Sequence, residues 1–176
     1  VTHVDSERII LTTSGIPVEK GNSVKMSKSK KNVVDPIDII EQYGADTARW
    51  FVLSDSPPDR DVEWTEAGIE GAWRHIQKVW KTATDIISQT AQTKESPKEN
   101  EQNILYLKKA QNAAIKGVSE GIERFAFNKA IARLYEFTGI LAKTKAPKAN
   151  KLEALEKLAI LMQPITPHLS EEIWMS

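Results

Sequence analysis

Apolar residues recur at helical spacing through most of the second half of the chain. From residue 66 to residue 90 they follow one another at steps of three and four, at Ile69, Trp73, Ile76, Trp80, Ala83 and Ile87. This spacing places all six on one face of a long helix, so we predict that they face a core. Four more helices are predicted after it, over residues 102–122, over about 128–143, through Leu152, Leu155, Leu158 and Met162, and, beyond Pro164 and Pro167, through residues 168–174.

Polar connectors separate these helices and indicate how they pack. They read KESPKENE at residues 94–101 and TKAPKAN at residues 144–150. Short loops between long amphipathic helices are typical of an antiparallel bundle. The predicted fold class is therefore mainly α, with a small α/β module ahead of an antiparallel helical bundle.

The first third of the chain has a different pattern, which predicts the α/β module. Residues 9–11 and 16–18 predict the two strands of a hairpin, with a serine–glycine turn between them. The breaker SPPDRD at residues 56–61 predicts a domain boundary. We therefore expect one domain over residues 1–62 and the helical bundle over residues 63–176.

Two short helices are predicted between the hairpin and the breaker. Asp35 is a favourable N-cap, Pro36 suits the first helical position, and Gly44 suits a C-cap. Asp46 is expected to cap the second of these helices and to pair with Arg49 one turn later. The residues of the first helix expected to face the core are Ile37, Ile40 and Tyr43.

Charge is unevenly distributed along a chain whose formal net charge is zero. Residues 1–31 carry +3, residues 32–72 carry −8 and residues 73–176 carry +5. This balance argues against indiscriminate nucleic-acid binding and permits a directed one. There is no cysteine, which excludes a disulfide framework and is compatible with a reducing compartment. The apolar runs are too short for a membrane-spanning helix.

The densest charge cluster lies in the segment VKMSKSKKN at residues 24–32. Four lysines fall within seven residues, and their ammonium groups repel one another unless an anion neutralises them. Such a loop suits the phosphates of a nucleoside triphosphate, where it would stabilise developing negative charge. The glycine-rich spacing of a Walker loop is absent. The alternative, from composition alone, is a solvated lysine-rich loop.

The order of the residues resembles a known signature. KMSKS followed by KNVVDPIDIIEQYGADTARWF is similar to the second signature of the class I aminoacyl-tRNA synthetases. The resemblance implies that Lys28 is the principal contact to the ATP phosphates and that Lys25 supports it. It also implies that Met26 anchors the loop by packing, and that Ser27 and Ser29 supply hydrogen bonds.

One position departs from that signature, because Lys31 stands where the family usually has glycine. The segments RWFVLSDSPPDRDVEWTEAGIEGAWRHIQKVW, RFAFNKAIARLYEF and LMQPITPHLSEEIW resemble the leucine branch of the family. The valine branch is the first alternative and the isoleucine branch the second. Leucine, ATP with Mg²⁺, and tRNA(Leu) are then the implied ligands of a monomeric, cytoplasmic ligase.

The helical bundle would dock RNA by shape and by phosphate contacts, each made by a flexible cation. The candidate RNA-contacting residues are Lys108, Lys109, Lys116, Arg124, Lys129, Arg133, Lys143, Lys145, Lys148 and Lys151. A solvated charge run is the alternative for each, and a non-catalytic RNA-binding module is the alternative for the whole chain. The three histidines are too scattered to predict a metal site.

The chain begins at Val1 and ends within an amphipathic pattern, which we interpret as a piece of a longer protein. The HxGH signature that the family uses to hold ATP is absent from it. We therefore expect no adenylation activity from this chain alone.

Overall fold

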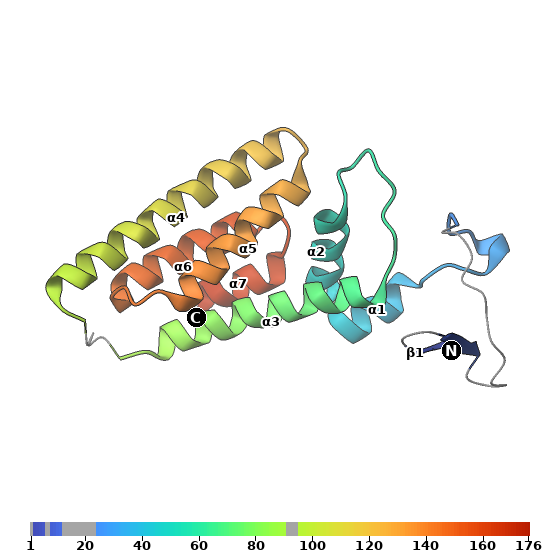
Figure 1. Ribbon diagram of the computed structural model, residues 1–176, viewed down its shortest axis with the longest axis horizontal. Helices are drawn as coiled ribbons and strands as arrows, with labels where there is room; N and C mark the ends of the chain where they lie inside the picture. The colour runs from blue at the N-terminus through green and yellow to red at the C-terminus, as the bar shows by residue number, and fades with distance from the viewer. Residues whose placement is uncertain (1, 6–7, 12–23, 91–94) are drawn as a thin grey trace. The chain divides into compact units, whose positions relative to one another are not determined.

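Two compact units, residues 1–34 and 35–176, make up the fold in the computed structural model. The structure describes residues 2–5, 8–11, 24–90 and 95–176. Figure 1 shows the helices of the second unit and the β1 strand of the first.

The first unit contains two short strands and one turn of 3₁₀ helix. Strand β1 (Thr2–Asp5) pairs antiparallel with strand β2 (Arg8–Leu11), with Thr2 opposite Leu11. The predicted strand at residues 9–11 is confirmed, but its partner is the segment that precedes it. The predicted second strand at residues 16–18 lies outside the described residues. Helix η1 (Lys28–Lys30) follows in the lysine-serine segment.

Helices α1 (Pro36–Tyr43) and α2 (Ala45–Asp55) open the second unit, and α1 begins where its capping signal places it. The Asp35 carboxylate accepts a hydrogen bond from the Ile37 backbone N–H at 2.9 Å, and Gly44 ends α1 with a φ of 87°. The predicted orientation of α1 is wrong at two positions, since Ile37 and Ile40 are exposed. Ile39 and Tyr43 instead pack against the core.

Five helices form the bundle, and all five predicted helices are present. They are α3 (Glu66–Ser88), α4 (Pro97–Glu123), α5 (Phe127–Lys143), α6 (Lys148–Met162) and α7 (Pro167–Met175). Figure 1 shows α4 and α5 lying side by side, with α6 and α7 behind them and α3 along one edge. No helix of the described part of the chain is long and apolar enough to cross a membrane.

Helix α4 begins five residues before the predicted start because its first turn is capped from both directions. The Ser96 hydroxyl accepts from the Glu99 N–H, and the Glu99 carboxylate accepts from the Ser96 N–H at 2.9 Å. This capping box satisfies two backbone donors at the helix start. The hydrogen bonds from Ser96 lower the pKa of the Glu99 carboxyl group. The segment predicted as a connector is therefore largely helix.

Two glycines of α4 lie against residues of α5. A Cβ added at Gly121 would lie 2.9 Å from the Cβ of Ala130, and one added at Gly117 would lie 2.8 Å from the Cγ of Arg133. The absence of these side chains lets the two antiparallel helices pack at short range.

Helix α3 buries a face slightly different from the predicted one. Its buried apolar positions are Ile69, Ala72, Ile76, Val79, Ala83 and Ile86. Trp73 and Trp80 are 40% and 37% exposed, so the prediction that they lie in the core is wrong. Both positions lie at the border of the buried face, where a tryptophan can cover apolar surface without being enclosed.

Helix α2 packs within the bundle rather than ahead of it. Trp50 and Phe51 are almost completely buried and belong to the same hydrophobic cluster as the residues of α3 to α7. The compact unit therefore begins at Asp35, and the breaker at residues 56–61 lies inside it. The assignment of residues 1–62 and 63–176 to separate functions stays a prediction.

Asp46 connects α2 to the last helix of the bundle. Its carboxylate accepts from the Leu169 backbone N–H at 2.8 Å, and it lies 2.9 Å from His168 Nδ1. The predicted pair with Arg49 is present at 2.9 Å. Helix α2 itself has no side-chain cap, so Asp46 caps α7 instead of its own helix.

Candidate functional site

The lysine-serine segment forms a tight turn with its cations exposed. Ser27 caps η1, with its backbone carbonyl and its hydroxyl both accepting from the Lys30 N–H, at 3.1 and 3.3 Å. The side chains of Ser27 and Ser29 are hydrogen-bonded to each other at 3.2 Å. Lys25 and Lys28 are exposed, and Met26 is 41% exposed. The turn therefore presents ammonium groups to solvent on a backbone held by local hydrogen bonds.

Lys31 adopts the left-handed conformation, with φ 52° and ψ 32°. Glycine adopts this region without the steric cost that a Cβ brings. The conformation gives a physical reason for the glycine that the resembling family usually has here. In this chain a lysine occupies the same conformation and adds a fourth exposed ammonium group beside those of Lys25, Lys28 and Lys30.

Asn32 holds the two ends of this turn together. Its side-chain oxygen accepts from the Ser27 N–H at 2.8 Å, and its side-chain nitrogen donates to the Lys25 carbonyl at 3.4 Å. The sequence analysis missed this residue. The signal that could have found it is its place directly after the left-handed residue, from which an asparagine can hydrogen-bond to nearby backbone.

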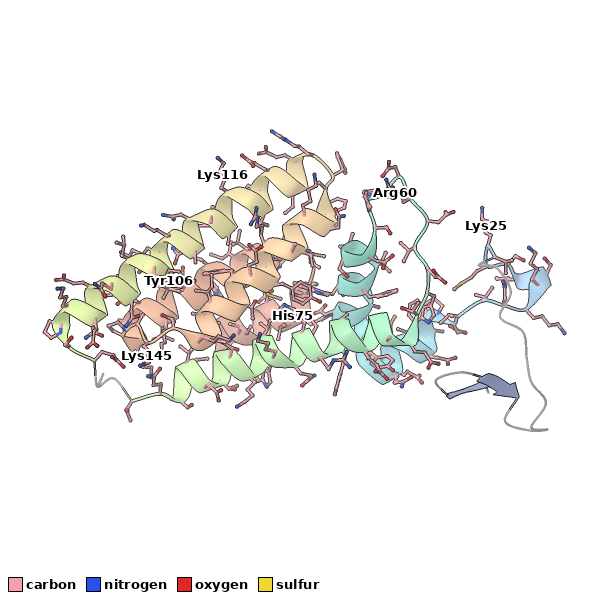
Figure 2. All side chains as sticks on the ribbon, viewed as in Figure 1. Lys25, Arg60, His75, Tyr106, Lys116 and Lys145 are labelled. Atoms are coloured by element: carbon pink, nitrogen blue, oxygen red, sulfur yellow. The ribbon has the colours of Figure 1, made fainter. Side chains whose placement is uncertain are left out.

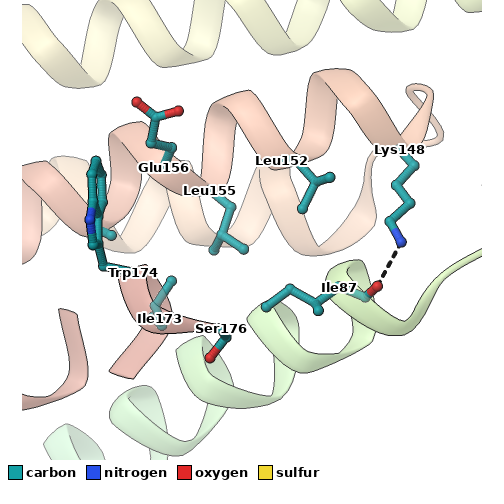
Figure 3. Close-up of a pocket in the computed structure, with 9 residues that line it drawn as sticks. Ile87, Lys148, Leu152, Leu155, Glu156, Ile173, Trp174 and Ser176 are labelled. Atoms are coloured by element: carbon teal, nitrogen blue, oxygen red, sulfur yellow. Dashed lines mark hydrogen bonds between the residues drawn. The ribbon is translucent and has the colours of Figure 1, made fainter. Parts of the chain in front are cut away.

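Two of the candidate RNA-contacting lysines are used inside the bundle. Lys148 Nζ donates to the Ile87 carbonyl at 2.6 Å, at the C-terminal end of α3 (Figure 3). Lys151 Nζ donates to Gln89 Oε1 at 3.1 Å, and burial lowers the pKa of Lys151. Cations are favourable at a helix C-terminus because the last carbonyls have no partner within the helix. These contacts connect α6 to the end of α3.

Three other candidates are paired with carboxylates. Lys145 lies 3.3 Å from Glu95, and Lys116 lies 3.9 Å from Glu120. Arg133 donates to Glu136 at 2.8 Å. The candidates with no ion pair among the described residues are Lys108, Lys109, Arg124, Lys129 and Lys143, and all five are exposed.

An open cleft between α4, α5 and the loop after α5 collects aromatic and basic side chains. It has a volume of about 490 Å³, and its lining includes Tyr106, Tyr135, Lys143 and Lys145. Figure 2 shows Tyr106 on α4 and Lys145 near the far end of α5. The sequence analysis missed the two tyrosines, which are 59% and 39% exposed. Exposed tyrosines beside lysines are groups on which an unpaired nucleotide can stack.

Tyr135 contacts two buried aromatic side chains, those of Trp50 and His75. The Trp50 indole N–H donates to its hydroxyl at 2.9 Å, and its ring lies 4.0 Å from that of His75, centroid to centroid. His75 also stacks on Trp50 at 4.6 Å. Burial, with a smaller contribution from the charge of Lys78, lowers the pKa of His75 to about 3. The imidazole is therefore neutral at physiological pH and acts as part of the core.

Two family descriptions match the chain, one before α3 and one from within α4 to the end. Residues 8–65 match "tRNA synthetases class I (I, L, M and V)", and residues 105–176 match "Anticodon-binding domain of tRNA ligase". Both descriptions are of tRNA synthetases, and each match covers less than half of the chain. The first match includes the lysine-serine turn and the second includes most of the bundle, so both units of the chain are represented.

Proteins named leucine–tRNA ligase are similar to nearly all of this chain. The protein from Dinoroseobacter shibae is 52% identical over 168 residues, which are 96% of this chain and 19% of that protein. The protein from Ruegeria pomeroyi is 52% identical over 91% of this chain and 18% of its own length. The chain thus spans about a fifth of the length of these relatives.

Solved structures of tRNA synthetases are similar to this chain. A leucyl-tRNA synthetase from Agrobacterium radiobacter K84, in a ternary complex with tRNA and LeuAMS, superposes with a TM-score of 0.76 at 28% identity. That likeness covers 86% of this chain and 20% of the other. A Mycobacterium tuberculosis methionyl-tRNA synthetase shares the fold, with a TM-score of 0.65 at 18% identity over 85% of this chain and 35% of its own.

Proposed function

We propose that this chain works as part of a leucine–tRNA ligase. In that reaction, leucine and ATP give leucyl-adenylate and pyrophosphate, and the leucyl group is then transferred to the terminal ribose of tRNA(Leu). The observation that carries the proposal is the 52% identity to leucine–tRNA ligases across both units, combined with the exposed lysine-serine turn. We assign the ATP loop to residues 1–62, as an α/β module, and tRNA docking to residues 63–176.

The turn would act on the phosphates of ATP by electrostatics. As the leucine carboxylate attacks the α-phosphate, negative charge grows on the α-phosphate and on the departing pyrophosphate. An ammonium group placed there stabilises the transition state more than the ground state. We assign this role to Lys28, with support from Lys25 and with hydrogen bonds from Ser27 and Ser29. Met26 would anchor the turn, and Mg²⁺ would arrive with ATP as part of the substrate.

Replacing the principal lysine in the full-length protein tests this assignment. Lys28→Ala should lower the rate of leucine-dependent ATP–pyrophosphate exchange by about 100-fold or more, with little change in the leucine KM. Lys98→Ala is the matched control, because Lys98 is also exposed and lies at the start of α4, far along the chain from the turn. An exchange rate unchanged in Lys28→Ala would refute the role of the turn.

We assign tRNA docking to the exposed face of α4 and α5. The supporting residues are the exposed cations that form no ion pair with any described residue, Lys108, Lys109, Arg124, Lys129 and Lys143, together with the ion-paired Lys116, Arg133 and Lys145. Backbone contacts of this kind weaken with salt, because each phosphate contact releases bound counterions. We expect a monomeric, cytoplasmic protein.

Binding of tRNA(Leu) to the 176-residue chain, measured from 50 to 200 mM salt, tests the docking face. Lys143→Ala should weaken binding several-fold and reduce the slope of log affinity against log salt by about one. Lys157→Ala is the control, because that lysine is half-buried and bonds to Glu156 at 2.9 Å. Affinity that does not depend on salt would contradict phosphate-led docking.

A further inference from the structure

The lysine-serine turn is closed by a side chain outside the KMSKS residues. Asn32 makes two hydrogen bonds, accepting from the Ser27 N–H at 2.8 Å and donating to the Lys25 carbonyl at 3.4 Å. These two backbone groups flank Met26. The Asn32 side chain, which follows η1, is therefore hydrogen-bonded to the backbone of Lys25 and Ser27, which precede η1.

The backbone path explains how Asn32 reaches back. Helix η1 makes one tight turn, in which the Lys31 N–H donates to the Lys28 carbonyl at 3.2 Å. Lys31 then takes the left-handed conformation, which reverses the direction of the chain. This reversal brings the side chain of Asn32, the next residue, into the turn, where it is half-buried while the lysine side chains remain exposed.

The turn needs such a restraint for an electrostatic reason. Lys25, Lys28, Lys30 and Lys31 carry like charges within seven residues and would open an unrestrained loop. Among the described residues, one other side-chain hydrogen bond to the backbone of the turn is present, in which the Ser27 hydroxyl accepts from the Lys30 N–H at 3.3 Å. Asn32 therefore adds side-chain hydrogen bonds to the backbone hydrogen bonds of the turn, and it reaches from the end of the turn back to Lys25 and Ser27 without using any ammonium group.

We propose that Asn32 is a positioning residue that fixes the lysine-serine turn, so that Lys28 meets the ATP phosphates in one geometry. The inference rests on the proposed function of the turn. Asn32 would not touch ATP; it would act through Lys28, by limiting where that ammonium group can lie. A misplacement of a reacting group by about 1 Å can cost about 100-fold in rate.

A double-variant cycle in the full-length protein tests the inference. The proteins compared are the wild type, Asn32→Ala, Lys28→Ala and the double variant, in leucine-dependent ATP–pyrophosphate exchange. Asn32→Ala should lower kcat by about 10- to 100-fold and leave the leucine KM and the melting temperature unchanged. In the Lys28→Ala background, the same Asn32→Ala change should have no further effect, because the group that it positions is gone.

The possible results separate this inference from the function on which it rests. If Lys28→Ala leaves the exchange rate unchanged, the proposed role of the turn fails, and the inference fails with it. If Lys28→Ala slows exchange but Asn32→Ala does not, the inference alone is overturned. If the double variant is slower than Lys28→Ala by the full factor of Asn32→Ala, Asn32 acts independently of Lys28 and the inference is also overturned. Asn112→Ala, an exposed asparagine on α4, is the matched control.

Discussion

The contact between Asp46 and the start of α7 gives the sharpest prediction about stability. The Asp46 side chain is only 8% exposed and accepts from the Leu169 N–H at 2.8 Å, in the first turn of α7. Thr166, at the N-cap position, makes no side-chain cap. The carboxylate of Asp46 therefore accepts the hydrogen bond from the start of α7 that a side chain at the N-cap position would otherwise accept. Asp46→Ala removes that carboxylate and leaves a backbone N–H without its partner.

The size of the stability loss in Asp46→Ala depends on which partners of the carboxylate are buried. Loss of a helix cap costs about 1 kcal/mol, and a hydrogen bond to a charged group is worth about 1.5–3 kcal/mol. Arg49 and His168 have side chains that are 45% and 71% exposed, so water replaces most of what they lose. We therefore expect Asp46→Ala to lower the free energy of unfolding by about 2–3 kcal/mol. For a chain of this size, that loss corresponds to a melting temperature about 4–12 °C lower.

Urea unfolding of the 176-residue chain, followed by circular dichroism, measures this loss directly. Asp46→Asn keeps an oxygen acceptor for the Leu169 N–H and should lose only about 1 kcal/mol. Asp59→Ala removes an exposed carboxylate from the loop after α2 and should change stability by less than about 0.5 kcal/mol. If Asp46→Ala is as stable as Asp59→Ala, the contact between α2 and α7 does not stabilise the fold as argued.

Three further predictions concern the bundle. Gly121→Ala should destabilise the chain by about 1–3 kcal/mol in urea unfolding, because the new Cβ would lie 2.9 Å from that of Ala130. Gly139→Ala, where a Cβ meets nothing within 4 Å, should instead stabilise α5 by about 0.5–1 kcal/mol, and a change of the opposite sign in either variant would contradict its prediction. Burial lowers the pKa of His75 to about 3. As the pH falls below the ordinary histidine pKa of about 6.5, His75 is therefore protonated in the unfolded chain but stays neutral in the folded one, and the free energy of unfolding decreases. From pH 7.5 to 5.5 the loss should be about 1.4 kcal/mol larger in the wild type than in His75→Phe, and equal losses would refute the assignment.

Local chemistry made the helix starts predictable from the sequence. Asp35 followed by Pro36 satisfies backbone donors and fixes φ within one turn, so that no distant contact is needed to begin α1. The Ser96 and Glu99 capping box has the same local character. The residues around this capping box are polar, and their composition alone favours a connector. Composition was the weaker signal there, and capping chemistry was the stronger one.

Contacts between distant residues were not predictable in the same way. Periodicity gives the apolar face of α3 only to within one side chain, and packing decides that Val79 is buried while Trp80 is not. The bond between Trp50 and Tyr135 joins residues 85 positions apart, and the bond between Asp46 and Leu169 joins residues 123 apart. Neither spacing carries a local signature, because each depends on how whole helices lie against each other.

The lysines show most clearly why charge alone does not define a binding surface. Lys143 and Lys148 lie five positions apart in the same basic stretch, and sequence reasoning gave them the same role. In the structure, Lys143 is exposed at the cleft between α4 and α5, whereas Lys148 donates to the Ile87 carbonyl. A lysine that already satisfies a helix C-terminus would lose that bond if it turned to a phosphate, and an exposed lysine loses only water. The cost of binding RNA would therefore differ between two neighbours of identical chemistry, and the proposed docking face depends most on the exposed lysines that have no ion pair in the part of the chain that the structure describes.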